Sequence, residues 1–496
     1  MNLTFQAWQT RAEQLKIEGR AFINGEYTDA ASGETFDCLS PVDGRFLAKV
    51  ASCDLADANR AVENARATFD SGVWSRLAPA KRKAKLIRFA ELLRKNVEEL
   101  ALLETLDMGK PIGDSSSIDI PGAAQALHWN AEAIDKVYDE VAPTPHDQLG
   151  LVTREPVGVV GAIVPWNFPL LMACWKLGPA LATGNSVVLK PSEKSPLTAI
   201  RIAQLAIEAG IPAGVLNVLP GYGHTVGKAL ALHMDVDTLV FTGSTKIAKQ
   251  LMIYAGESNM KRIWLEAGGK SPNIVFADAP DLKAAAEAAA SAIAFNQGEV
   301  CIAGSRLLVE RSIKERFLPM VVDALKAWKP GHALDPATRV GALVDTTQLD
   351  TVLGYVEAGK ADGATLVTGG RRVLEDTCGV YVEPAIFDGV TNAMRIAREE
   401  IFGPVLSVIT FDSAEEAIAI ANDSPFGLAA AVWTSDISKA HRSARALRAG
   451  SVWINQYDGG DMTAPFGGFK QSGNGRDKSL HAFDKYTELK ATWIKL

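Results

Sequence analysis

The chain is poor in cysteine and histidine, and neither residue type is spaced as disulfide partners or metal ligands are. Five cysteines stand among 496 residues, an odd number without a C-x-x-C pair. A disulfide framework and a zinc site are therefore not expected, and a reducing cytoplasm is the expected compartment. The seven histidines are equally scattered, so we predict no metal cofactor.

Long apolar runs and an excess of positive charge are also missing. No stretch of about 20 apolar residues occurs, which argues against a membrane-spanning helix. Residues 1–19 mix Gln, Arg, Glu and Lys with scattered apolar residues and lack the apolar centre of a secretory signal. The net charge of −7 offers no basic field for nucleic acid. We expect neither a membrane nor a nucleic-acid partner.

What the chain does contain is enough length and apolar content for two large domains. Hydrophobic residues make up 47% and charged residues 22%, the usual balance of a globular protein. Segments with helical periodicity fill 55–110, and short apolar strands then alternate with amphipathic helices. The expected strands are 157–163, 185–189, 215–219 and 238–241, and the expected helices are 170–182, 196–209 and 225–232. This alternation predicts a parallel sheet covered on both faces.

A second alternating block begins near Ile263 and predicts a second α/β lobe. Its alanine-rich helix is expected over 282–295, with Asp278 as N-cap and Pro280 in the first turn. Further strands are expected at 306–309, 403–409 and 429–433. Segments 137–152 and 486–496 look like extended arms outside either lobe.

One thiol stands apart from the other four. Cys301 lies in the run Phe-Asn-Gln-Gly-Glu-Val-Cys-Ile-Ala-Gly-Ser-Arg, a polar, glycine-flanked loop at the end of the alanine-rich helix. A nucleophilic cysteine needs access and surroundings that favour the thiolate, whereas a structural cysteine lies inside an apolar periodic segment. The loop favours a catalytic thiol, and a structural one remains the alternative.

Signals for a dinucleotide cofactor are present but individually weak. The run from Gly221 to Gly227 has one residue too many for G-x-G-x-x-G, so a plain strand-to-helix turn fits equally well. Phe241-Thr-Gly-Ser244 ends a strand at a tight turn into a helix beginning near Ile247, whose free amides can hold a phosphate; an ordinary capped helix is the alternative. Lys190 and Glu193 follow another strand end.

Lys190 and Glu193 have the chemistry to bind the two hydroxyls of a ribose. An acidic side chain there would repel a 2'-phosphate and favour NAD over NADP, although a solvated surface pair is the common fate of these residues. Glu266, at an apolar strand end before two glycines, is a candidate general base with a pKa raised by desolvation, or a solvent-facing carboxylate. Asn167, between Pro165 and Pro169, is a candidate oxyanion donor or a turn former.

Taken in order, these motifs resemble one known family over nearly the whole chain. Asn167, the Lys190 and Glu193 pair, and the Gly243-Ser244 turn come first; Glu266, Cys301, Glu399-Glu-Ile-Phe-Gly-Pro404 and Pro465-Phe-Gly-Gly-Phe-Lys-Gln-Ser-Gly473 follow. The pattern resembles that of the NAD(P)-dependent aldehyde dehydrogenase superfamily. Within it, 455–464 and 475–481 look like the bacterial γ-glutamyl-γ-aminobutyraldehyde and 4-guanidinobutyraldehyde dehydrogenases of polyamine breakdown.

The resemblance implies an α/β fold of two Rossmann-like lobes with a small β oligomerisation arm. The implied NAD-binding domain spans 1–136 and 153–265, the catalytic domain 266–480, and the arms 137–152 and 481–496. A homotetramer or a dimer is implied as well.

The resemblance also implies a mechanism. The Cys301 thiolate adds to an aldehyde, the Asn167 amide and the Cys301 N–H stabilise the oxyanion of the thiohemiacetal, and hydride loss leaves a thioester that water activated by Glu266 hydrolyses to an acid. NAD is the implied cofactor, with NADP less favoured. The implied cofactor-binding residues are Ile163, Pro165, Trp166, Lys190, Glu193, Gly223, Gly227, Phe241, Gly243, Ser244, Leu265, Glu266, Gly268, Glu400 and Phe402.

Family positions also imply a tunnel for a small-molecule aldehyde. Its implied lining residues are Phe168, Met172, Trp175, Tyr457, Asp458, Asp461 and Phe466. The aromatic wall suits a methylene chain, and Asp458 and Asp461 are candidates to face an ammonium or guanidinium group, or are merely solvated. The expected substrates are ω-amino, ω-guanidino or γ-glutamylamino butyraldehydes.

Rival readings and two departures from the family pattern accompany this hypothesis. A broad-specificity or 3-hydroxypropionaldehyde-type enzyme is the alternative; a CoA-acylating dehydrogenase is disfavoured by the presence of Glu266, and a non-catalytic relative by the intact catalytic residues. Asp477 stands where many relatives have a Glu proposed to relay protons, which leaves that role open. Lys246 follows Gly243-Ser244-Thr245 at a position where relatives commonly have a Glu, so the local charge is reversed.

Overall fold

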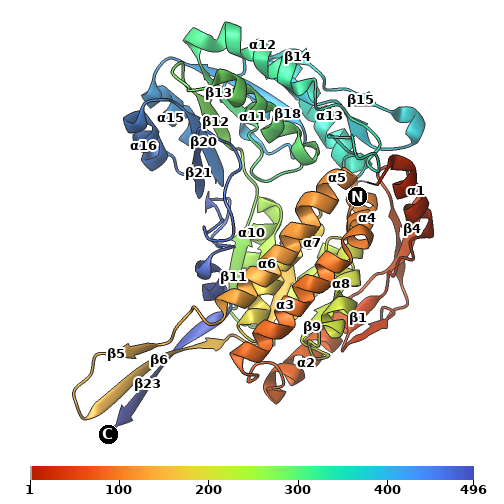
Figure 1. The fold of residues 1–496 in the computed structure, drawn as a ribbon, viewed down its shortest axis with the longest axis vertical. Coiled ribbons are helices and arrows are strands. Elements are labelled where there is room, and N and C mark those ends of the chain that lie inside the picture. The colour runs from red at the N-terminus through yellow and green to blue at the C-terminus, as the bar shows by residue number, and fades with distance from the viewer. Residues whose placement is uncertain (1–2) are drawn as a thin grey trace.

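The computed structural model describes residues 3–496, so the first two residues of the implied NAD-binding domain lie outside the described residues. Figure 1 shows two α/β lobes, one built from the first half of the chain and one from the second, and a narrow β arm that projects away from both. The C-terminus lies at the tip of this arm. The predicted class, two α/β lobes with an arm, is confirmed.

The sheet of the first lobe has seven strands in the order β11-β10-β7-β8-β9-β1-β2, of which the first five are parallel. Its strands are β1 (Ala21–Ile23), β2 (Glu26–Thr28), β7 (Val159–Ile163), β8 (Ser186–Lys190), β9 (Leu216–Val218), β10 (Thr238–Thr242) and β11 (Arg262–Glu266). The central strands β7 and β8 are buried throughout. Both faces are covered, as the uninterrupted apolar strands predicted.

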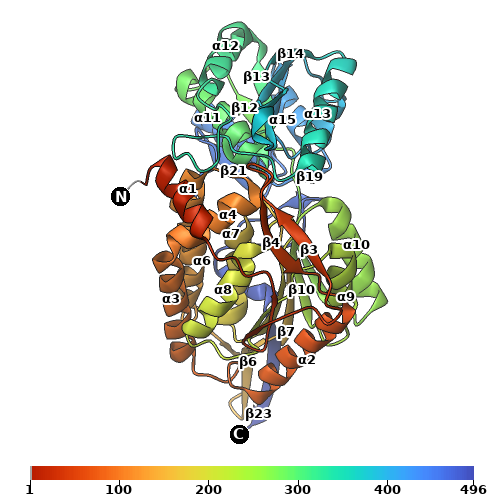
Figure 2. The same ribbon diagram turned by 90° about the vertical axis from the view of Figure 1, so that its right-hand side faces the viewer.

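Alternate residues of these strands enter cores on opposite faces. Val160 and Ala162 of β7 pack with α3, α6, α7 and α8, whereas Val159 packs with α2 and α9. Figure 2 shows α2 and α8 on different sides of this lobe. The helices are α2 (Leu55–Ser71), α3 (Pro79–Lys95), α4 (Val97–Met108), α6 (Ile120–Ala133), α7 (Pro169–Ala182), α8 (Leu197–Glu208), α9 (Lys228–Leu232) and α10 (Thr245–Glu257).

The second lobe repeats the plan with a sheet in the order β14-β17-β18-β13-β12-β20-β21. Its strands are β12 (Pro272–Val275), β13 (Arg306–Glu310), β14 (Thr365–Thr368), β17 (Ala385–Asp388), β18 (Val405–Phe411), β20 (Ala429–Trp433) and β21 (Ser451–Ile454). Helices α11 (Leu282–Ala294) and α12 (Lys314–Leu325) pack on one face, and α13 (Thr346–Ala361) and α15 (Ala414–Asn422) on the other.

The arm is a three-stranded antiparallel sheet in the order β23-β6-β5. β23 (Thr487–Lys495) pairs along its whole length with β6 (Gln148–Pro156), and β5 (Glu140–Ala142) pairs with the other edge of β6. Leu489 and Trp493 of β23 are exposed by more than half of their surface. The C-terminal strand is thus an open edge that carries apolar side chains.

Two local expectations need correction or qualification. Asp278 does not cap α11; Asp281 does, accepting from the Ala284 N–H at 3.0 Å, while Asp278 accepts from the Thr434 hydroxyl. Most predicted strand and helix boundaries shift by only one or two residues, as helix and strand ends commonly do. None of the helices within residues 3–496 is long and apolar enough to cross a membrane.

Candidate active site

A cavity of about 720 Å³ is lined by residues of both lobes. The first lobe contributes the loop after β7, α7 and the ends of β10 and β11. The second contributes α11, the Cys301 loop, the segment around Glu400 and the stretch from Trp453 to Lys478. Its size is that of a typical small-molecule site. Of the predicted site residues, those lining it are Pro165, Trp166, Asn167, Phe168, Met172, Trp175, Gly243, Ser244, Glu266, Gly268, Cys301, Glu400, Phe402, Tyr457, Asp458, Asp461 and Phe466.

The first-lobe part of the cavity lies where the strand order reverses. The chain runs from β7 to β8 and β9 on one side, and then β10 pairs with the other edge of β7. The loops after β7 and β10 therefore diverge and leave a crevice at the carboxyl ends of the strands, the usual ligand position in open α/β sheets.

Ser244 caps the helix that opens into this crevice. Its hydroxyl accepts from the Ile247 N–H at 3.4 Å, so α10 begins at Thr245, two residues earlier than expected. A Cβ on Gly243 would lie 2.5 Å from the Phe241 ring, so only glycine lets the backbone turn here. A 13-residue helix with its N-terminus at a strand end is a favourable place for a phosphate.

The predicted ribose-binding residues lie together, beyond the residues that line the cavity. Lys190 ends β8 and donates to Glu193 at 3.3 Å and to the Pro191 carbonyl at 2.6 Å. A Cβ on Gly227 would lie 3.4 Å from Lys190 Cδ and 4.0 Å from the Ile163 side chain. Gly223 has open space where a side chain would be. Gly223 and Gly227 thus leave the neighbourhood of Lys190 free of other side chains at these two positions.

Glu400 and Phe402 approach the cavity from the second lobe. Glu400 accepts from the Gly269 N–H at 3.1 Å, and a Cβ on Gly268 would collide with its carboxylate. Burial raises the pKa of Glu400 to about 7. Phe402 has a left-handed backbone (φ 55°) and meets Trp166 edge-to-face at 5.1 Å. A non-glycine residue in this conformation is held by its surroundings, here by Gln348, which donates to the Phe402 carbonyl at 2.7 Å.

The Cys301 loop follows α11 directly, as the sequence predicted. Three successive residues, Asn296, Gln297 and Gly298, have positive φ (46°, 57° and 71°) and turn the chain into the cavity. A Cβ on Gly298 would lie 2.4 Å from the Gly403 carbonyl carbon, so the tight turn requires glycine there. Cys301 is partly exposed to the cavity, while Cys38, Cys53 and Cys174 are buried.

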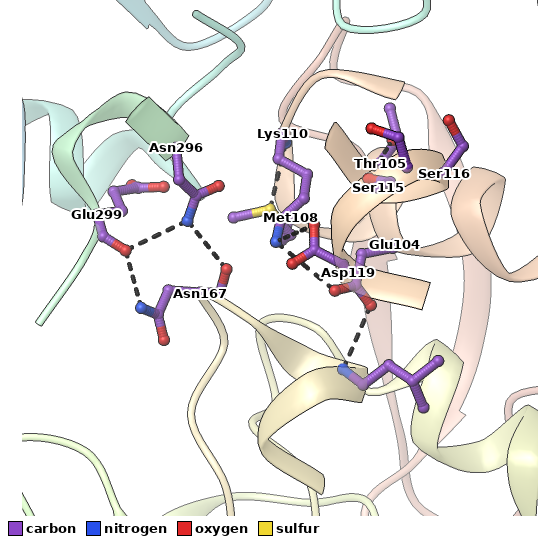
Figure 3. Close-up of polar contacts among 12 residues, drawn as sticks. Glu104, Thr105, Met108, Lys110, Ser115, Ser116, Asp119, Asn167, Asn296 and Glu299 are labelled. Atoms are coloured by element: carbon purple, nitrogen blue, oxygen red, sulfur yellow. Dashed lines mark hydrogen bonds and ion pairs between the residues drawn. The ribbon is translucent and has the colours of Figure 1, made fainter. Parts of the chain in front are cut away.

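Asn167 is tied to this loop by a small hydrogen-bond network (Figure 3). Its amide donates to the Glu299 carbonyl at 2.8 Å. The Asn296 amide donates to the Asn167 carbonyl at 3.0 Å and to the Glu299 carbonyl at 3.2 Å. One N–H of the Asn167 amide is thereby bonded, and the other has no acceptor among the described residues.

The surroundings of Cys301, whose pKa the sequence leaves open, oppose the thiolate. Burial, and to a lesser extent the nearby carboxylates Glu400, Glu266 and Asp458, together raise its pKa to about 12. The thiol is therefore protonated at neutral pH in the ligand-free protein, and a base must accept its proton before it can attack.

Glu266 is a buried carboxylate without a hydrogen-bond partner among the described residues. It ends β11, is 3% exposed, and neither carboxylate oxygen is satisfied. Glycines crowd it, since a Cβ on Gly467 would lie 2.7 Å from Oε1. Burial, and secondarily the charge of Asp477, raises its pKa well above the ordinary value. This matches the desolvated carboxylate expected from the sequence.

Asp477 lies near Glu266 in an opposite environment. It is 1% exposed and forms ion pairs with Lys176 of α7 and with Lys485. Burial alone would raise its pKa, but the two ammonium groups lower it below the ordinary value. Both lysines also lower the pKa of Glu266 from where burial would leave it.

Another buried charge cluster, formed by Lys110, Glu104 and Asp119 (Figure 3), contacts Phe168 of the cavity lining. Lys110 contacts Asp119 at 2.9 Å and Glu104 at 3.7 Å, and its ammonium lies 4.1 Å from the centre of the Phe168 ring. Glu104 accepts from the Leu170 N–H at the start of α7. This cluster fixes the position of Phe168 through a cation–π contact.

The cavity wall is formed largely by aromatic side chains, and two aspartates, Asp458 and Asp461, also line it. Trp175 and Phe466 meet edge-to-face at 5.2 Å, and the Tyr457 hydroxyl donates to the Ile302 carbonyl at 2.6 Å. Asp461 accepts from the backbone and hydroxyl of Thr463, at 2.8 and 2.6 Å. Of the two aspartates, Asp458 is the one without a hydrogen bond to another described residue.

Sequence reasoning assigned no role to Lys176, Lys485, Lys478 or Asn296. Lys478 and Asp477 stand together in the Gly475–His481 run that resembled the subgroup, which was the one available signal. Lys176 lies in a helix that reads as apolar core. Among residues 3–496 no group of three or more His, Cys, Asp or Glu side chains is arranged to hold a metal ion.

Comparisons with known proteins identify the family of this chain. The model of the aldehyde dehydrogenase family matches residues 27–492. The NADP/NAD-dependent aldehyde dehydrogenase PuuC of Escherichia coli is 58% identical over 489 residues, covering 99% of this chain and 98% of PuuC. The chain belongs to the aldehyde dehydrogenase family.

Two solved structures are similar to this chain over its whole length. The structure of a mutant of the AldA indole-3-acetaldehyde dehydrogenase of P. syringae, in complex with NAD+ and IAA, is 83% identical to this chain, with a TM-score of 0.99 and 100% of both chains covered. A γ-glutamyl-γ-aminobutyraldehyde dehydrogenase from Burkholderia cenocepacia is 64% identical, with a TM-score of 0.98 and the same coverage.

Proposed function

We propose that this enzyme oxidises an aldehyde to a carboxylic acid with NAD, using Cys301 as nucleophile, Asn167 as oxyanion donor and Glu266 as general base. The observation that carries these assignments is their convergence on one cavity: a reachable thiol, an amide held by the Glu299 carbonyl, and a buried carboxylate with no other partner. These are the three groups that acyl transfer through a thioester requires.

In this scheme the thiol loses its proton to Glu266, whose raised pKa makes it a stronger base than an ordinary carboxylate. The sulfur attacks the aldehyde carbon, and the Asn167 amide with the Cys301 N–H stabilises the oxyanion. Loss of hydride leaves a thioester on Cys301. Glu266 releases the thiol proton to solvent and then takes a proton from the water that attacks the thioester, whose carbon–sulfur bond breaks to give the acid and free Cys301.

NAD, when bound, supplies the hydride acceptor. The residues that would hold it are the Ser244 helix terminus for the pyrophosphate, Lys190 and Glu193 for one ribose, and Glu400 with Phe402 for the other ribose and the ring. The open space at Gly223 and the crevice after β7 and β10 support this placement. Glu193 favours NAD over NADP, because its charge opposes a 2'-phosphate. PuuC is named for both cofactors.

The substrate we propose is an ω-amino, ω-guanidino or γ-glutamylamino butyraldehyde of polyamine breakdown. The aromatic wall accepts a methylene chain, Asp458 offers a distal charge, and the Burkholderia relative bears the name of such a substrate. A second candidate is indole-3-acetaldehyde, the substrate named for the 83% identical AldA, because Trp175, Phe466 and Phe168 can pack against an indole ring.

We propose the remaining organisation as the resemblance implies it. Residues 1–136 and 153–265 form the NAD-binding domain, 266–480 the catalytic domain, and 137–152 with 481–496 the arms. The open, apolar edge of β23 supports assembly into a dimer or tetramer, since such edges pair with another chain. Unpaired thiols at all five cysteines support the cytoplasm.

A steady-state panel tests the function. The wild type, Cys301→Ala and Glu266→Gln are assayed for NADH formation with 4-aminobutanal, 4-guanidinobutanal, the γ-glutamyl amide of 4-aminobutanal, 3-hydroxypropanal and indole-3-acetaldehyde, with NAD and with NADP. We expect activity in the wild type only, with one of the nitrogen-containing butanals preferred and with NAD preferred. Unchanged activity in Cys301→Ala would refute the mechanism, and a preference for indole-3-acetaldehyde would select the second candidate.

A further inference from the structure

Lys478 is the only Lys, Arg or His among the described residues that line the cavity. Every other charged lining residue is acidic. The ammonium lies over two rings of the wall, 4.8 Å from the centre of Trp175 and 5.7 Å from that of Phe466. A cation on the rings that would flank a substrate can meet a charged group of that substrate.

The Lys478 ammonium is not paired with an anion among the described residues. Across residues 3–496 its ammonium has no ion pair within 4.0 Å and no hydrogen bond, whereas the buried Lys176 and Lys485 are both paired with Asp477. Burial lowers the pKa of Lys478, opposed by the nearby Asp458. A partly buried ammonium without a bonded anion has donors to spare for a ligand.

Asp458 supplies the opposite charge from the facing loop. Its carboxylate makes no hydrogen bond with another described residue, and Asp461 beside it is already bonded to Thr463. Both Asp458 (φ 57°) and Lys478 (φ 60°) have left-handed backbones, which side chains other than glycine adopt at a cost. Each charge is thus held at the cavity by a constrained backbone, yet the two side chains are not bonded to each other.

We propose that Lys478 and Asp458 form a subsite for the distal end of the substrate, binding the carboxylate and the ammonium of an α-amino acid group. The inference rests on the proposed function and selects within it. Among the proposed substrates, the γ-glutamylamino aldehyde alone ends in both charges. An ω-amino or ω-guanidino aldehyde would meet Lys478 as a like charge, which disfavours it.

Four aldehydes that differ only at the distal end test the subsite. They are the γ-glutamyl, glutaryl, 4-aminobutanoyl and butanoyl amides of 4-aminobutanal, which end respectively in both charges, a carboxylate, an ammonium and a neutral methyl. The measured quantity is kcat/KM with NAD for each aldehyde, expressed relative to the butanoyl compound in the same enzyme. This ratio removes general effects on folding or on the chemical step.

We expect Lys478→Met to lower the relative kcat/KM of the glutaryl and γ-glutamyl compounds about tenfold and to raise that of the 4-aminobutanoyl compound. Asp458→Asn is expected to have the opposite effects: it should lower the relative kcat/KM of the 4-aminobutanoyl compound and raise that of the glutaryl compound. Lys478→Arg, which keeps the charge, should retain the wild-type ratios. Lys283→Met, at an exposed lysine of α11 outside the cavity, is the matched surface control.

Unchanged ratios in Lys478→Met would overturn the subsite, because a lysine that only packs on the rings does not distinguish a carboxylate from a methyl. If Lys478→Arg lowered the relative kcat/KM of the glutaryl and γ-glutamyl compounds as much as Lys478→Met, the subsite would also be overturned, because arginine keeps the charge. The proposed function fails separately, if the wild type oxidises none of the four aldehydes with NAD. If the wild type oxidises all four aldehydes with similar kcat/KM, the subsite is refuted and the proposed function stands.

Discussion

Glu266 and Asp477 are two buried carboxylates beside one cavity, and their environments push their protonation in opposite directions. Glu266 has crowding glycines and no hydrogen-bond partner, and its pKa is raised; Asp477 is held by Lys176 and Lys485, and its pKa is lowered. Burial acts on both, so the presence of cationic partners decides the difference. A pair separated in this way provides one group able to exchange protons and one that stays ionised.

The largest expected effect comes from removing the unpartnered carboxylate. Glu266→Gln keeps the shape but cannot accept a proton, so we expect kcat to fall by roughly 10²- to 10⁴-fold. The steady-state rate of NADH formation at saturating aldehyde and NAD measures this. A change of less than about twofold in kcat would place the base elsewhere.

Removing the partnered carboxylate should mainly destabilise the protein. Asp477→Asn leaves Lys176 and Lys485 buried without an anion, at a cost of about 3–5 kcal/mol in the free energy of unfolding. Denaturant unfolding measures it, with Asp484→Asn, an exposed neighbouring aspartate, as the control. A cost near that of the control would mean that the ion pairs contribute nothing to stability.

Separate substitutions of the cation and of the anion near Glu266 should shift its pKa in opposite directions. Activity falls as pH drops through the pKa of Glu266, because the base must be ionised. Lys485→Met removes a charge that lowers this pKa, so the acid limb of kcat should move to higher pH; Asp477→Asn removes one that raises it, so the limb should move to lower pH. Shifts in the same direction would exclude electrostatic coupling.

The smallest effect concerns stability. The folded-state pKa of Glu266 lies above its unfolded value, so its favourable contribution is complete below the unfolded pKa and is lost as pH rises through the folded pKa. Glu266→Gln should therefore stabilise the protein by about 1–2 kcal/mol at pH 8 and by less at pH 4.5. Thermal unfolding at both pH values checks this, and a gain independent of pH would contradict it.

The sequence predicts the two lobes, the arm and the positions of the motifs because apolar strands and helical periodicity are local signals. It also marks Cys301, Glu266 and Asn167, whose neighbours along the chain are distinctive. Pairings between distant segments leave no such signal. Lys176 and Lys485 are 309 residues apart in number yet share Asp477. The raised pKa of Cys301 depends on its burial between the lobes and on carboxylates from three other segments.

The central claim is that Cys301 carries an acyl group that Glu266 helps to release. The most direct measurement is peptide mass spectrometry of Glu266→Gln after mixing with NAD and the preferred aldehyde. Because Glu266 serves both the thiol and the water, the account predicts that NADH and an acyl adduct on the Cys301 peptide form slowly and in equal amounts, up to about one of each per subunit. NADH formed in that amount without any adduct on Cys301 would contradict it.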